Sequence, residues 1–104
     1  MTKLDLPQED ARKLMLSGVA LVVIDVRTPA EFAAGHIPNA VNIELDAIVS
    51  GNIPEALADK SAKYLLYCRS GRRSGIAARY LHDHGWEDVV NFGGILDWPY
   101  EIER

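Results

Sequence analysis

The only cysteine of this 104-residue chain, Cys68, is followed directly by six cationic or small residues, "RSGRRS". This segment can bind an anion, because successive backbone N–H groups in a glycine-containing turn point inward and a helix N-terminus adds partial positive charge. A cysteine in such surroundings favours the thiolate, so its pKa should fall and its reactivity should rise. The pattern therefore predicts a nucleophilic cysteine with an anion-binding loop. The predicted substrate-binding residues are Arg69, Ser70, Gly71, Arg72, Arg73 and Ser74.

Individual residues of this loop suit different tasks. Gly71 can adopt backbone conformations that a residue with a β-carbon resists. Ser74 can donate its hydroxyl to sulfur or cap the helix that follows. The arginines form a local positive region on a chain of net charge -4, and that region would attract an anionic sulfur donor or an oxyanion.

A less specific interpretation exists for each of these residues. A lone cysteine is most often a small apolar residue that ends a buried strand. The cationic loop after Cys68 favours the functional interpretation. For Arg72 and Arg73, substrate contact and a solvated surface position are equally open, and for Arg79 the surface position is the better interpretation.

The elements that must position this loop alternate between strands and helices. The apolar runs 20–26 and 63–68 predict strands buried on both faces, and 40–43 and 87–92 predict shorter ones. Helices are expected at 8–18, at 28–35, within 45–60 with a break near 51–54, at 72–85, and as a last turn or helix after residue 93. This order predicts a three-layer α/β/α domain with a mainly parallel sheet. Binding sites in such sheets form beyond the carboxyl ends of the strands, where Cys68 lies.

Two of these helices carry local detail. Thr28 is a plausible N-cap, Pro29 suits the first helical position, and Gly35 should end that helix. In the helix after the cysteine loop, one face is expected to bury Ile76, Ala77, Tyr80 and Leu81.

Charged residues and histidines outside the loop are interpreted as structural. Asp25 and Arg27 should support the site, with Arg27 paired to Glu31 and Asp25 accepting N–H groups from neighbouring loops. His36 could act as a base, but a hydrogen bond to the backbone is the better interpretation. His82 and His84 are two residues apart on a helix and cannot share a face, so no metal site is expected.

Three segments together resemble a known family. "CRSGRRS" resembles the active-site loop of rhodanese-type sulfurtransferases. Residues 25–43, "DVRTPAEFAAGHIPNAVNI", resemble the N-terminal signature of that family, with Asn39 where glycine is frequent. Residues 89–98, "VVNFGGILDW", resemble its C-terminal signature, with paired glycines and a tryptophan. The order and spacing of the three match a single rhodanese-like domain over residues 1–104.

The resemblance implies a five-stranded parallel sheet flanked by helices. It also implies that Cys68 takes sulfane sulfur from a donor such as thiosulfate, as a persulfide, and yields it to a thiophilic acceptor. No second cysteine is present, so the acceptor is expected to be cyanide, a small thiol or another protein's cysteine. No cofactor is expected. The loop residues favour this step independently, since they offer N–H donors without a carboxylate, and covalent capture divides one difficult transfer into two easier ones.

Other functions stay open at this point. A cysteine phosphatase or arsenate reductase uses a related loop, but needs five residues between cysteine and arginine, whereas four separate Cys68 from Arg73. A non-catalytic regulatory module, or a sulfur carrier specific for one protein, is the alternative of a different class. Turnover with free small-molecule donors would distinguish an enzyme from such a carrier.

Composition limits the partners. The acidic balance argues against nucleic acid or an anionic membrane. The longest apolar stretch, residues 14–24, is interrupted by Ser17 and Gly18 and is shorter than the roughly 20 residues that span a bilayer. Acidic residues stand near the N-terminus, where a signal peptide carries positive charge. We expect a cytoplasmic monomer.

Overall fold

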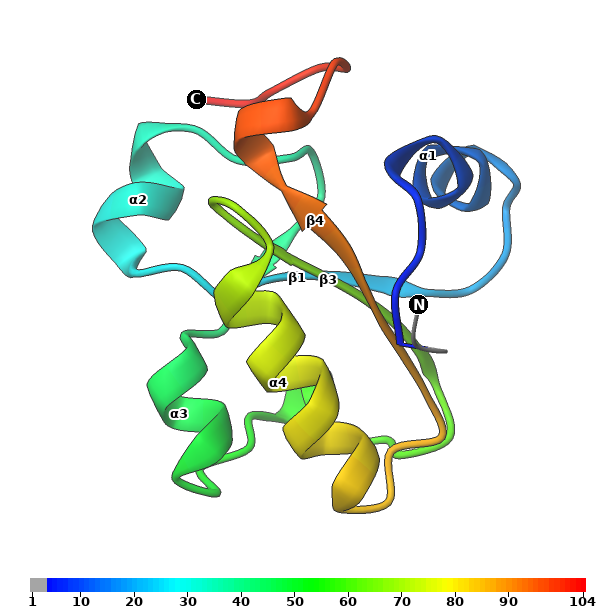
Figure 1. The fold of residues 1–104 in the computed structure, drawn as a ribbon, viewed down its shortest axis with the longest axis vertical. Coiled ribbons are helices and arrows are strands. Elements are labelled where there is room, and N and C mark those ends of the chain that lie inside the picture. Colours follow the sequence, from blue (N-terminus) through cyan, green and yellow to red (C-terminus); the bar gives the residue numbers. More distant parts are fainter. Residues whose placement is uncertain (1–3) are drawn as a thin grey trace.

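Four parallel strands form the centre of the protein, in a computed structural model that describes residues 4–104 (Figure 1). Their order in the sheet is β2-β1-β3-β4, and every neighbouring pair is parallel. The carboxyl ends of the strands therefore meet at one edge of the sheet. The strands are β1 (Val22–Asp25), β2 (Val41–Asn42), β3 (Lys63–Cys68) and β4 (Asp88–Gly94).

Helices cover both faces of this sheet, which confirms the predicted three layers. The helix α1 lies on one face, and α3 and α4 lie on the other (Figure 1). The short helix α2 stands near the carboxyl edge of the sheet, on the same side as the C-terminus. The helices are α1 (Gln8–Leu16), α2 (Pro29–Ala34), α3 (Leu45–Val49) and α4 (Arg72–Asp83), with 3-10 turns η1 (Glu55–Leu57) and η2 (Ile95–Asp97).

The central strand β3 is buried on both faces, as its continuous apolar run predicts. Leu65 and Tyr67 belong to the core on the α1 side, whereas Tyr64, Leu66 and Cys68 belong to the core under α3 and α4. Each of these five side chains is at most 1% exposed. Since successive strand residues point to opposite faces, Cys68 ends β3 on the side of α4.

The expectation of five strands is wrong for residues 4–104, which form four. The segment before α1 runs beside β4, where Asn91 accepts from the N–H of Leu6 at 2.9 Å and donates its own N–H to Leu4 at 2.6 Å. Asp5 and Asn91 form a single parallel bridge. Pro7 follows directly, lacks an N–H and leads into α1, so the pairing goes no further. The fifth strand is reduced to one bridge.

Helix termini follow their sequence signals closely. Thr28 is the N-cap of α2, and its hydroxyl accepts from the backbone N–H of Glu31 while the Glu31 side chain accepts from the backbone N–H of Thr28. Pro29 is the first residue of that helix and Gly35 is its C-cap. Asn39 has a φ of 69°, a conformation that asparagine tolerates better than most residues.

The buried face of α4 confirms the prediction for Ala77 and Leu81, with Tyr80 partly buried against the same core, but the prediction for Ile76 is wrong. Ile76 is 46% exposed, whereas Ser74, Ala77, Ala78 and Leu81 are fully buried. Small residues bring α4 close to β3 and β4, and the polar Ser74 joins the buried stripe because its hydroxyl has hydrogen-bond partners there. No helix within residues 4–104 is long and apolar enough to cross a membrane.

Candidate active site

The thiol of Cys68 lies at the carboxyl edge of the sheet, under the start of α4. Cys68 is the last residue of β3, and its side chain is 1% exposed. An irregularity in the pairing between β3 and β4 sets Cys68 opposite Gly94. The backbone N–H of Gly71 donates to Sγ at 3.0 Å, and Ser74 Oγ lies 3.4 Å from Sγ. The residues 69–74, here called the cysteine loop, thus turn N–H groups toward the sulfur.

Two opposing effects set the acidity of this thiol. Burial is the larger single effect and would raise the pKa of Cys68. The Ser74 hydroxyl and the backbone N–H groups of Ser74, Gly71 and Ser70 favour the thiolate, and together they bring the pKa below its ordinary value. The site can therefore hold a negative charge on sulfur in a buried position.

Gly71 gives the cysteine loop its shape. It is the N-cap of α4 with a φ of 96°, a left-handed conformation that favours glycine. A β-carbon at Gly71 would also stand 3.2 Å from the Cα of Gly93. Ser74 lies inside the first turn of α4, so it contacts sulfur and does not act as the cap.

The paired glycines at the end of β4 support the loop from beneath. A β-carbon on Gly94 would overlap the carbonyl oxygen of Arg69 and come within 2.5 Å of the Cα of Ser70. The N–H of Leu96 donates to the same Arg69 carbonyl at 3.2 Å. The backbone of the cysteine loop therefore rests directly on the backbone of β4, and only glycine at position 94 leaves room for it.

Two amide side chains that the sequence did not single out also reach this region. Asn91 on β4 bonds to Ser74, Gly71 and Gly93. Gln8 on α1 donates through Nε2 to the carbonyl oxygen of Gly94 at 2.9 Å. The only sequence signal for Asn91 was a polar residue within the apolar run of a predicted buried strand.

The loop arginines have different surroundings. Arg69 and Arg72 are exposed and make no ion pair among residues 4–104. Arg73 instead makes two bonds to Glu31 on α2, Nη1 to Oε1 at 2.8 Å and Nη2 to Oε2 at 2.9 Å. The pKa of Glu31 falls to about 2, chiefly because the Arg73 guanidinium bonds to its carboxylate. Partial burial opposes this shift, and the N–H and hydroxyl of Thr28 add to it. The charge of Arg73 is therefore largely compensated.

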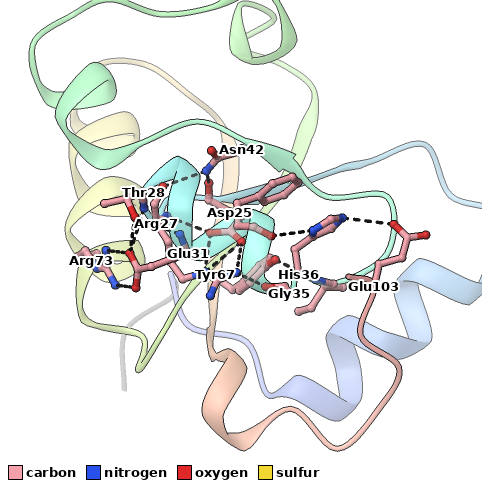
Figure 2. A network of polar contacts seen from close by, with 12 residues as sticks. Asp25, Arg27, Thr28, Glu31, Gly35, His36, Asn42, Tyr67, Arg73 and Glu103 are labelled. Atoms are coloured by element: carbon pink, nitrogen blue, oxygen red, sulfur yellow. Dashed lines mark hydrogen bonds and ion pairs between the residues drawn. The ribbon is translucent and has the colours of Figure 1, made fainter.

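The predicted pair between Arg27 and Glu31 is wrong, because Arg27 turns to Asp25 (Figure 2). Asp25 is fully buried and accepts from the backbone N–H of Arg27 at 2.9 Å, from its Nε at 3.0 Å and from its Nη2 at 2.7 Å. Arg27 Nη2 also donates to the carbonyl oxygen of Gly35 at 2.6 Å. This pair holds the end of α2 against β1, and so holds Glu31 beside Arg73.

Tyr67 and His36 complete the polar network of Figure 2 without offering a free base. The Tyr67 hydroxyl accepts from the N–H of Ile37 at 3.0 Å, and burial raises the pKa of Tyr67. The His36 ring stacks on Phe32, with Nδ1 3.0 Å from the Phe32 carbonyl oxygen and Nε2 3.3 Å from Glu103. Within residues 4–104, no three histidine, cysteine or acidic side chains gather in a way that could hold a metal ion.

A buried thiol beneath inward N–H groups, at the carboxyl edge of a parallel sheet, is an arrangement that can hold a small anionic group on sulfur. The family model for the rhodanese-like domain matches residues 7–100, so the chain belongs to the rhodanese-like family.

Individual relatives agree with this assignment. The chain is 41% identical over 85 residues to YtwF of Bacillus subtilis, covering 80% of this chain and 78% of that protein. It is 39% identical over 74 residues to thiosulfate sulfurtransferase PspE of Escherichia coli, covering 71% and 70%. The crystal structure of a rhodanese-like domain protein from Staphylococcus aureus has a TM-score of 0.80 at 30% identity, covering 95% of each chain.

Proposed function

We propose that the protein is a sulfurtransferase that carries sulfane sulfur on Cys68 as a persulfide. The observation that carries this proposal is the buried Cys68 Sγ with the N–H of Gly71 at 3.0 Å and the hydroxyl of Ser74 nearby. A thiolate held in this way is a competent nucleophile, and the same donors can stabilise the anion of a persulfide. The similarity to PspE, which is named a thiosulfate sulfurtransferase, supports the same chemistry.

The transfer has two displacements. In the first, the Cys68 thiolate attacks the outer sulfur of thiosulfate, the new S–S bond forms, and the S–S bond of thiosulfate breaks with release of sulfite. In the second, an acceptor attacks the outer sulfur of the persulfide, and the Cys68 thiolate leaves. Cyanide then yields thiocyanate, and a thiolate acceptor yields a new persulfide. Electrons balance within each step, so no cofactor is needed.

Each part of the site has a role in this scheme. The N–H groups of Ser70, Gly71 and Ser74 hold the negative sulfur, and exposed Arg69 and Arg72 attract an anionic donor. Asp25 and Arg27 support the site indirectly by fixing α2.

The physiological acceptor is proposed to be a thiol, from a small molecule or from another protein. A reducing compartment such as the cytoplasm keeps the thiol of Cys68 available. The second candidate, a carrier that exchanges sulfur with one protein partner only, uses the same cysteine and is favoured by the burial of Cys68, which restricts access. Phosphoryl transfer is disfavoured because Glu31 already occupies Arg73, the arginine that a phosphoryl group would need.

The proposal is tested by intact-mass analysis after exposure to thiosulfate. The native protein should gain the mass of one sulfur atom and lose it when cyanide is added. Cys68→Ser should gain nothing while retaining its far-ultraviolet circular dichroism, because the substitution is small. Native protein alkylated beforehand with iodoacetamide serves as the control.

The outcomes separate the candidates. A sulfur atom on Cys68→Ser would refute the assignment of the nucleophile. A native protein that is loaded by a persulfidated protein but not by thiosulfate would favour the partner-specific carrier.

A further inference from the structure

Asn91 lies on β4 and faces the cysteine loop. Its Oδ1 accepts from the hydroxyl of Ser74 at 2.7 Å and from the backbone N–H of Gly93 at 2.9 Å. Its Nδ2 donates to the carbonyl oxygen of Gly71 at 3.1 Å. One side-chain amide therefore joins the end of β4 to Gly71 and Ser74, two of the residues whose polar hydrogens approach the sulfur of Cys68.

Backbone groups fix the orientation of this amide. Nδ2 can only donate and Oδ1 can only accept. A flipped amide would set Nδ2 against the N–H of Gly93 and Oδ1 against the carbonyl of Gly71, so both bonds would be lost. Oδ1 must therefore face Ser74, and the Ser74 hydroxyl is the donor between them.

The Ser74 hydroxyl has one proton and two acceptors within reach. Its oxygen lies 2.7 Å from Asn91 Oδ1 and 3.4 Å from Cys68 Sγ, and Ser74 is fully buried, so no solvent competes. With the thiol protonated, the hydroxyl donates to Asn91. Once the thiol loses its proton to solvent, the charged sulfur is the stronger acceptor and can draw the hydroxyl toward itself. Asn91 keeps the Ser74 oxygen in place for that change.

We propose that Asn91 is a positioning residue that directs both the hydroxyl of Ser74 and the N–H of Gly71 at Cys68 Sγ, and thereby sets the acidity of the thiol. The inference deepens the proposed role of Cys68, on which it rests. Its test reads the thiol itself and needs no sulfur transfer, so it can fail while the proposed function stands.

The experiment compares the native protein, Asn91→Ala, Ser74→Ala and the double variant. The rate of alkylation by iodoacetamide, measured against pH, gives the pKa of Cys68, which is the only cysteine. Ser74→Ala removes a hydroxyl that can donate to the thiolate, and Asn91→Ala leaves that hydroxyl and Gly71 without the amide that positions them, so the thiol pKa should rise in each variant. Alkylation at pH 7 should slow by about three- to tenfold.

The double variant decides whether Asn91 acts through Ser74. If it does, Ser74→Ala raises the pKa less in the Asn91→Ala background than in the native protein, because the hydroxyl is no longer directed. An equal rise in both backgrounds would overturn the proposal. So would a native thiol pKa in Asn91→Ala together with a lowered melting temperature, since that result describes a purely structural residue.

Two further variants serve as a second test of the Asn91 amide and as a control. Asn91→Asp keeps the shape and the acceptor but cannot donate to Gly71 and adds a negative charge, so it should raise the thiol pKa more than Asn91→Ala does. It also carries the test if Asn91→Ala does not fold, and an unchanged or lower pKa in Asn91→Asp would overturn the proposal. The control is Asn52→Ala, an exposed asparagine whose side chain contacts Ser50, and its thiol pKa should equal that of the native protein.

Discussion

At the scale of single residues, the arginines of the cysteine loop differ in their surroundings, although they are close together in the sequence and have the same charge. Arg72 is exposed and unpaired among residues 4–104, while Arg73 shares its charge with Glu31. The low pKa of Glu31, about 2, keeps that carboxylate ionised at neutral pH. The stability that this shift contributes is present above the unfolded pKa of Glu31 and is lost only as the pH falls toward 2. Arg72 is therefore the stronger attractor of anions at pH 7.

This difference predicts opposite effects for two neutralising substitutions. Arg72→Ala should raise the thiosulfate concentration needed for half-maximal loading of Cys68 about two- to fivefold at low ionic strength, and less at high salt. Glu31→Gln should lower that concentration, because it frees the charge of Arg73. Loading is followed by intact mass at several salt concentrations, with Arg79→Ala, an exposed arginine further along α4, as the control. Equal effects of Arg72→Ala and Arg79→Ala would contradict this account.

At the scale of elements, the end of β4 sets the position of the cysteine loop. Gly94 leaves no space for a β-carbon, because backbone atoms of Arg69 and Ser70 occupy it. Backbone atoms cannot rotate away as a flexible side chain can. Any larger residue must therefore push the loop off the strand.

Gly94→Ala should lower the free energy of unfolding by about 1–3 kcal/mol and slow the loading of Cys68. Gly75→Ala is the matched control for stability only, because its β-carbon would contact the Asn91 amide, at 3.4 Å, and no backbone atom. Within α4, alanine should be neutral or stabilising by up to about 1 kcal/mol. Urea unfolding and intact mass measure the two effects, and a fully stable, fully loaded Gly94→Ala would show that the loop does not rest on β4.

At the scale of the whole molecule, two separate cores on the two faces of the sheet hold the layers together. Leu65 lies in the core beneath α1, and Leu66 lies in the core beneath α3 and α4. Both side chains are fully buried. The site lies at the carboxyl edge of the sheet, where β3 and β4 end, and both cores hold these strands in place.

Leu65→Ala and Leu66→Ala should each cost about 2–5 kcal/mol of unfolding free energy, measured in urea. Leu96→Ala, at a position that is 62% exposed, should change it by less than about 0.5 kcal/mol. A small cost at only one of the two core positions would mean that the corresponding face is not packed as described here.

Local features of this fold could be predicted from the sequence. The Thr28, Pro29 and Gly35 boundaries of α2 follow from the hydrogen-bonding capacity and backbone freedom of those residues alone. The doubly buried strand that ends at Cys68 follows from its unbroken apolar run. The inward N–H groups of residues 69–74 follow from a glycine and small residues at a helix start. Each depends on neighbours within a few positions.

Contacts between distant segments were decided only by the tertiary structure. Glu31 had Arg27 four residues away, yet it pairs with Arg73, because Asp25 occupies Arg27 and the sheet order brings α2 beside the start of α4. Asn91 reaches Ser74 through the register of β3 and β4, and Pro7 limits the fifth strand to one bridge. The residues of the cysteine loop could therefore be predicted from the sequence, whereas the pairing of distant side chains with one another could not. That pairing depends on strand order and register, which the packing of the whole chain determines.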